Sequence, residues 1–255
     1  MNERKRWLVV GVFAMAMAWV ESAVVFYLRT MIDRIEPYQA NPLPFSGGLG
    51  KAELIRELAT LVMLLTIGLL AGKSWRSRLG YAAIAFGLWD IFYYVFLKVL
   101  CGWPKSLIDW DILFLLPLPW WGPVWAPVSI ALLMTFWGTL AIQVERPRND
   151  LISRAIPWML NVVGMILALY VFMSDALNVV GKNPAALRTL LPIHFNWTLF
   201  AVALVLMSVP VAFEVWQFVR GKFLSNDDSS SGKFFTGKAN ASNCPRSASR
   251  ERVSQ

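Results

Sequence analysis

Residues 80–100 read GYAAIAFGLWDIFYYVFLKVL, and this stretch is long and apolar enough to cross a lipid bilayer as one helix. It nevertheless contains two charged residues, Asp90 and Lys98. An ionisable side chain is costly at membrane depth, and one that is retained there usually has a function. The stretch therefore predicts both a transmembrane fold and a functional site within it.

The same kind of apolar stretch occurs six times along the 255 residues. Of these residues 57% are hydrophobic and 16% are charged, against about 25% charged in ordinary soluble domains. Because one globule of this size could not bury so much apolar surface, we expect an all-α, polytopic transmembrane helical bundle. The predicted spans are residues 7–29, 57–72, 80–100, 126–143, 156–176 and 194–219.

Lysine and arginine are distributed unevenly between the two sides of this predicted bundle. Of the 24 basic residues, 16 fall in the amino-terminal segment, the even-numbered loops and the carboxyl-terminal segment, and 7 fall in the other loops. Cytoplasmic loops are the ones enriched in basic residues, so both termini are predicted to be cytoplasmic. The net charge of +8 is explained by this distribution, and we expect no nucleic-acid partner.

The ends of the chain allow further predictions. Residues 1–224 are predicted to form the six-span domain, and residues 225–255, rich in Ser, Asn, Lys and Arg, a disordered cytoplasmic tail. A cleavable signal peptide is the alternative for the first stretch, but its apolar pattern continues to Leu28, beyond the hydrophobic h-region of a normal signal peptide. Two cysteines on opposite sides and a single histidine argue against a disulfide framework, a bis-histidine haem and a zinc site with two histidines.

Charged residues recur at matching depths in the first and third spans. Glu21 precedes Arg29 by eight residues, and Asp90 precedes Lys98 by eight residues in a helix running the same way. Tyr94 lies one turn from both Asp90 and Lys98, so these three are predicted to share a broad helix face. If the two spans pack together, an acidic tier lies beneath a basic tier, suited to a proton or a cation. The alternative is that each charge is neutralised by a neighbour and only holds the bundle together.

More polar residues fall at the same predicted side of the membrane. Glu57 begins the second span, Asp175 ends the fifth, and His194 and Asn196 open the sixth. A pocket open to the periplasm would collect them, although each is also common as a helix cap or a hydrogen-bonded structural residue.

The segment between the third and fourth spans, residues 102–127, reads GWPKSLIDWDILFLLPLPWWGPVWAP. Its apolar run is too short to span and is interrupted by prolines, which predicts a re-entrant or interfacial element that covers the polar pocket. Asp109 and Asp111 are candidate ligands for a cation, with a helix N-cap as the alternative for either, and no metal site is assigned. The tryptophans are expected as interfacial anchors, with stacking on a flat ligand as the alternative.

Between residues 20 and 127 the chain resembles a family of uncharacterised six-helix bacterial inner-membrane proteins. The resemblance implies a multi-pass protein of the bacterial inner membrane and carries over no activity or cofactor. It is carried by Glu21, Tyr27-Leu28-Arg29, Glu57, WDIFYY at residues 89–94, Lys98, Gly102-Trp103-Pro104, Trp110-Asp111, Pro119-Trp120 and Gly122-Pro123.

Three functions are compatible with these features. The first is transport or binding of a proton, a cation or a small ligand at a periplasm-facing site. Its candidate ligand-binding residues are Glu21, Arg29, Asp90, Tyr94, Lys98, Asp109, Asp111 and His194. The second is an intramembrane enzyme acting on a lipid-linked substrate, with Asp90 or Asp109 as base and Lys98 or Arg29 holding an anionic headgroup. The third is an accessory subunit whose partner is a larger membrane complex.

Overall fold

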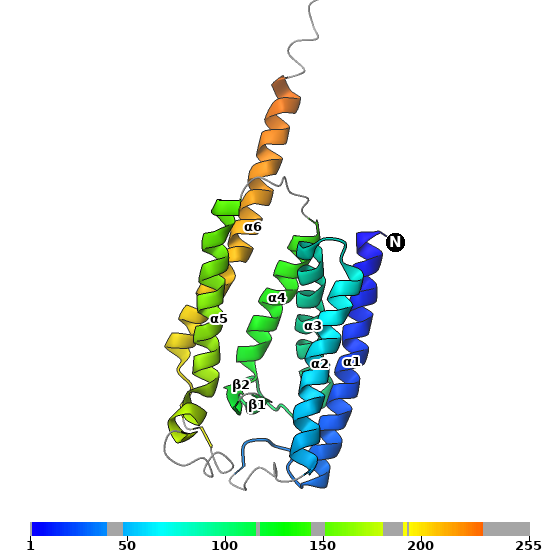
Figure 1. Ribbon diagram of the computed structural model, residues 1–255, viewed down its shortest axis with the longest axis vertical. Coiled ribbons are helices and arrows are strands. Elements are labelled where there is room, and N and C mark those ends of the chain that lie inside the picture. Colours follow the sequence, from blue (N-terminus) through cyan, green and yellow to red (C-terminus); the bar gives the residue numbers. More distant parts are fainter. Residues whose placement is uncertain are drawn as a thin grey trace, which may run out of the picture. The chain divides into compact units, whose positions relative to one another are not determined.

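The computed structural model describes residues 2–39, 48–115, 118–143, 151–180, 191–192 and 194–231. Contacts divide the chain into two units, Met1–Val215 and Trp216–Gln255, and the account below concerns the first. The elements are α1 (Glu3–Met31), α2 (Gly48–Ala71), α3 (Trp75–Cys101), β1 (Trp110–Phe114), β2 (Trp120–Pro123), α4 (Trp125–Gln143), α5 (Leu151–Val180) and α6 (Trp197–Ser231) (Figure 1).

Within the described residues, six helices are long and apolar enough to cross a membrane, which confirms the all-α, multi-pass prediction. One boundary difference affects the site: α2 begins at Gly48, whereas the predicted span began at residue 57. The added turns include Glu53 and Arg56, which are good helix formers that lower hydropathy without ending a helix. Two charged residues that the sequence prediction left in a loop therefore lie on a helix.

Helix α3 occupies the middle of the first four helices and packs on α1, α2 and α4. Its contact with α4 is made by small residues: a Cβ atom added at Gly87 would lie 2.4 Å from the carbonyl oxygen of Ala131. On α4, a Cβ added at Gly138 would lie 2.4 Å from the carbonyl oxygen of Gly80. Small residues allow the backbones of membrane helices to approach closely and gain dispersion energy that a lipid environment does not otherwise supply.

Helices α5 and α6 pack against each other through a second close contact. A Cβ added at Gly164 would lie 2.7 Å from the carbonyl oxygen of Ala203. Nearby, the side-chain amide of Asn161 donates a 3.1 Å hydrogen bond to the carbonyl oxygen of Met207. Pro210, inside α6, has no N–H to donate to the carbonyl oxygen of Leu206, and the amide of Asn161 adds a donor at the next residue, Met207.

The segment predicted as re-entrant or interfacial contains an antiparallel hairpin, which the sequence did not predict. Strand β1 pairs with β2 in the register Asp111 opposite Gly122 and Ile112 opposite Trp121, with an irregularity before Phe114. The hairpin is held to α5 by the ring of Trp120, which stacks on Phe172 at 6.5 Å with an interplanar angle of 3°. The hairpin therefore packs on α5.

At the carboxyl-terminal end, the structure describes α6 as far as Ser231. The helix therefore includes the first residues of the segment 225–255 that the sequence assigned to a tail. Residues 232–255 lie outside the described residues, as does Cys244.

Candidate functional site

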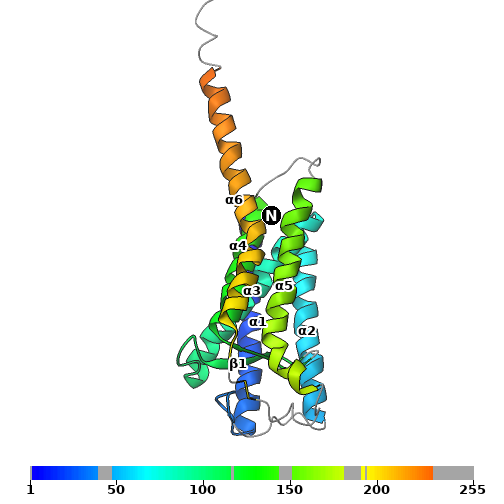
Figure 2. The same cartoon turned by 90° about the vertical axis from the view of Figure 1, so that its left-hand side faces the viewer.

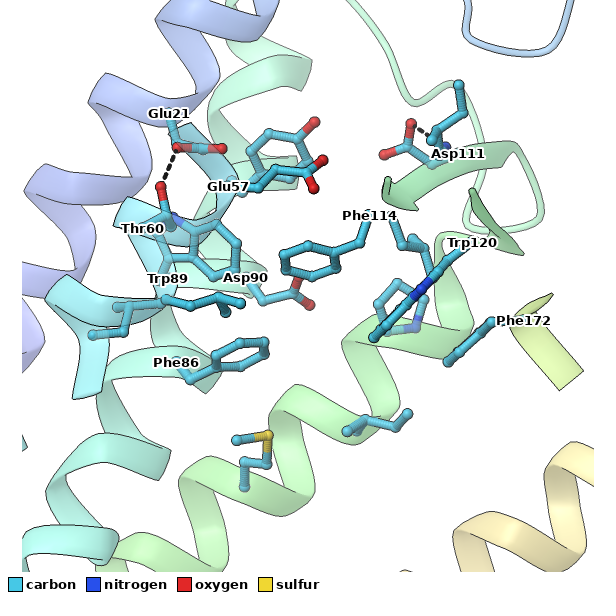
Figure 3. Close-up of a pocket in the computed structure, with 18 of the residues that line it drawn as sticks. Glu21, Glu57, Thr60, Phe86, Trp89, Asp90, Asp111, Phe114, Trp120 and Phe172 are labelled. Carbon is cyan, nitrogen blue, oxygen red and sulfur yellow. Dashed lines mark hydrogen bonds between the residues drawn. The ribbon is translucent and has the colours of Figure 1, made fainter. Parts of the chain in front are cut away.

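A cavity of about 730 Å³ lies inside the first unit and is lined by residues from all six helices and from the hairpin. Figure 3 shows carboxyl groups from α1, α2, α3 and β1 facing this space, with aromatic rings between and beside them. The lining contains five carboxyl side chains, Glu21, Glu53, Glu57, Asp90 and Asp111. It also contains three guanidinium groups, those of Arg29, Arg34 and Arg56.

The first group of charges joins α1 to α2. Arg56 forms ion pairs with Glu21 and with Glu53, and the hydroxyl of Thr60 donates a 3.2 Å hydrogen bond to the second oxygen of Glu21. Figure 3 shows Glu21 turned toward Thr60. Glu21 was expected to share a proton or cation directly with Asp90, but its hydrogen-bond partners come from α2. Because the sequence prediction placed Arg56 in a loop, it did not identify Arg56 as the partner of Glu21.

The second group joins α1 to the hairpin. Arg29 Nη2 donates a 2.8 Å hydrogen bond to Asp111 Oδ1, and the guanidinium lies 4.3 Å from the ring centroid of Trp103. Asp111 is only 1% exposed, and its own strand contributes a further bond from Ile112 N at 2.9 Å. Burial raises the pKa of the Asp111 carboxyl, and the Arg29 guanidinium opposes that rise. The pair holds β1 against the end of α1.

Two more carboxyl groups face the cavity with different surroundings. Both oxygens of Glu57 accept from the backbone N–H of Leu115, at 3.1 and 3.0 Å. Asp90 is buried, and its Oδ2 has no hydrogen-bond partner among the described residues. Figure 3 shows the Asp90 carboxyl beside the ring of Phe114. A buried acceptor of this kind is costly unless a proton, an ion or a ligand completes its hydrogen bonding.

Arg34 follows α1 and is the third cationic group of the lining. Its guanidinium donates to the carbonyl oxygens of Pro37, at 3.1 and 2.9 Å, and of Gln39, at 2.8 Å. Burial lowers the pKa of Arg34, and the neighbouring Arg29 charge lowers it further. Its hydrogen bonds fold the chain back at the end of α1.

Of the eight candidate residues, the structure places five in the cavity lining: Glu21, Arg29, Asp90, Tyr94 and Asp111. Lys98 is outside it and exposed, and its Nζ donates to the carbonyl oxygens of Gly102 and Pro104, at 3.2 and 2.7 Å. Eight residues turn an α-helix by about 80° beyond two full turns, which carries Lys98 away from the face of Asp90. Lys98 therefore does not line the cavity with Arg29, Asp90 and Tyr94.

Asp109 and His194 also lie outside the lining. Asp109 Oδ2 accepts from the backbone N–H groups of Lys105 and Ser106, at 2.7 and 3.2 Å, and so stabilises the turn before the hairpin. His194 is exposed. Among the residues the structure describes, no group of three or more His, Cys, Asp or Glu side chains is arranged to hold a metal ion.

Sequence reasoning missed Arg34, Glu53, Arg56 and Thr60. The signal for two of them was present, because Glu53 and Arg56 are spaced i and i+3, as helical ion pairs are. A lower hydropathy threshold at the start of the second span would have placed both on the helix. Comparisons of the chain with protein-family models, with curated proteins and with solved structures found no match.

Proposed function

We propose that this multi-pass membrane protein binds a small ligand that offers a positive charge or hydrogen-bond donors to the carboxyl groups of the cavity. The observation that carries the proposal is the buried, unpartnered Oδ2 of Asp90 facing a cavity. The charge balance supports it, because the lining has two more carboxyl than guanidinium groups. A proton, a metal cation of low charge or an organic ammonium group would each reduce that excess.

An intramembrane enzyme with a lipid-linked substrate receives less support. Its anionic headgroup needs a free cation, but Lys98 lies outside the cavity and Arg29 is paired with Asp111. Binding, alone or as part of transport, is therefore the function that the geometry favours.

The substitution Asp90→Asn tests the proposal because it removes the charge while keeping the side chain's size. The protein would be studied in phosphatidylcholine nanodiscs, with thermal unfolding measured against sodium and ethylammonium ions. We expect at least one of them to raise the melting temperature of the wild type. A ligand at a hundred times its Kd stabilises the folded state by about 2.7 kcal/mol. That shift should disappear in Asp90→Asn.

Asp175→Asn is the matched control, since Asp175 lies on α5 and outside the cavity lining. It should keep the full ligand-induced shift. An equal shift in wild type and Asp90→Asn would show that the ions act elsewhere, and no shift in the wild type with either ion would refute cation binding.

We further propose that the protein lies in a bacterial inner membrane with both termini in the cytoplasm, as its lysine and arginine distribution and its family resemblance suggest. Alkaline phosphatase fused after Ser106 should be active, because that segment would lie in the periplasm. The same enzyme fused after Ser231 should be inactive. The opposite pair of activities would place the polar end of the cavity toward the cytoplasm.

A further inference from the structure

Much of the cavity beyond the carboxyl groups is apolar. Its lining there comes from α2 to α6 and includes Leu64, Phe86, Leu133, Met134, Met165 and Met207. Asn161, which lines this part, donates its amide to the carbonyl oxygen of Met207. One continuous space thus has a charged part and an apolar part. A ligand that fills this space therefore needs a charged part and an apolar part.

The exposed part of the lining is apolar as well. The most exposed lining side chains are Leu65 (52%), Leu79 and Met165 (46% each), Trp158 (42%) and Leu49 (41%). They lie on α2, at the start of α3 and on α5, in helices long and apolar enough to span a membrane. Exposed apolar side chains on such helices face hydrocarbon. The cavity therefore communicates with the lipid phase through its apolar side.

We infer that the ligand of this cavity is a single-chain amphiphile with an ammonium headgroup, which enters from the bilayer between α2 and α5. The headgroup lies at Asp90 and the chain lies among the apolar residues of α4, α5 and α6. This inference rests on the proposed function and adds the substrate class and the route. The cavity volume falls within the range of about 300–1,000 Å³ that holds one drug-sized molecule, which is smaller than a two-chain phospholipid.

A photoreactive probe tests this inference directly. Hexadecylamine carrying a diazirine at the middle of its chain would be irradiated with the protein in phosphatidylcholine nanodiscs, and the labelled residues mapped by mass spectrometry. We expect labels on cavity-lining residues of α4 and α5, such as Met134 and Met165. Unlabelled hexadecylamine should compete, and hexadecyl sulfate should not, because its head repels the carboxyl groups.

Two substitutions locate the head and the entrance. Asp90→Asn should lower labelling of the lining by about tenfold or more, since it removes a charge-assisted hydrogen bond. Met165→Trp should obstruct the entrance and lower the same labelling. Met159→Trp is its matched control, because Met159 is also on α5, is 67% exposed and does not line the cavity. The half-exposed position of Met165 allows a larger side chain without disturbing a core.

The outcomes separate this inference from the proposed function. If ethylammonium stabilises the wild type through Asp90 while the long-chain probe labels only lipid-facing residues, the small polar ligand stands and the amphiphile is refuted. If the lining is labelled equally in wild type, Asp90→Asn and Met165→Trp, the head and the route are both wrong. If the wild type shows neither a stabilisation by ethylammonium nor labelling of the cavity lining, the proposed function and the inference are both refuted.

Discussion

Replacing Arg29 by alanine is expected to destabilise the protein by about 3–5 kcal/mol, because it leaves the Asp111 carboxylate buried without its charge partner. The reverse change, Asp111→Ala, should cost a similar amount. The double substitution Arg29→Leu with Asp111→Leu should recover much of the loss, since it removes both charges and fills the space with apolar atoms. Unfolding in mixed micelles, followed by tryptophan fluorescence, measures all of these free energies.

The matched control is the ion pair of Lys105 and Glu36, which joins the same two regions of the chain but is exposed. Breaking it by Lys105→Ala should leave the free energy of unfolding almost unchanged, because water screens an exposed ion pair. Equal losses from both pairs, or a double substitution no better than the singles, would show that the Arg29–Asp111 contact does not depend on its burial.

Gly87→Ala is expected to destabilise the contact between α3 and α4 by about 1–3 kcal/mol, through overpacking. The new Cβ would lie 2.3 Å from Thr135 Oγ1 and 2.4 Å from the carbonyl oxygen of Ala131, so the two helices must separate. Gly87→Leu should cost more. Thermal unfolding and the yield of folded protein after extraction measure the loss.

Gly11→Ala, in α1, is the control for this substitution. Its Cβ would lie 3.4 Å from the side chain of Leu88, which is ordinary van der Waals contact. Because alanine is the better helix former by about 0.5–1 kcal/mol, Gly11→Ala should be neutral or slightly stabilising. A loss at Gly11 equal to that at Gly87 would mean that the close approach of α3 and α4 is not what makes glycine necessary.

The helices were predictable because a membrane span has one strong signal, a long apolar run, and all six have it. The hairpin had no comparable signal. Residues 110–114 contain Trp, Ile and Phe, which favour strands, but a two-stranded hairpin is marginal in isolation and depends on what it packs against. Its support, the stacking of Trp120 on Phe172, joins residues far apart in the chain.

The candidate site was predictable in part for a related reason. Charges at membrane depth are rare, so Glu21 and Asp90 could be selected without any knowledge of packing. Their neighbours could not be selected in this way. Hydropathy left Arg56, the partner of Glu21, in a loop. The sequence also did not show that the ammonium group of Lys98 donates to carbonyl oxygens of the segment after α3.

The hydrogen bond from Asn161 to Met207 has a consequence for how the chain is made. Pro210 cannot donate to the carbonyl oxygen of Leu206, and the polar group that reaches this turn of α6 from outside, the amide of Asn161 at Met207, belongs to the preceding helix. The last span should therefore be inserted as a pair with the one before it, and its residence in the bilayer should depend on a partner synthesised earlier. In this region the unit of membrane insertion is then the pair of α5 and α6.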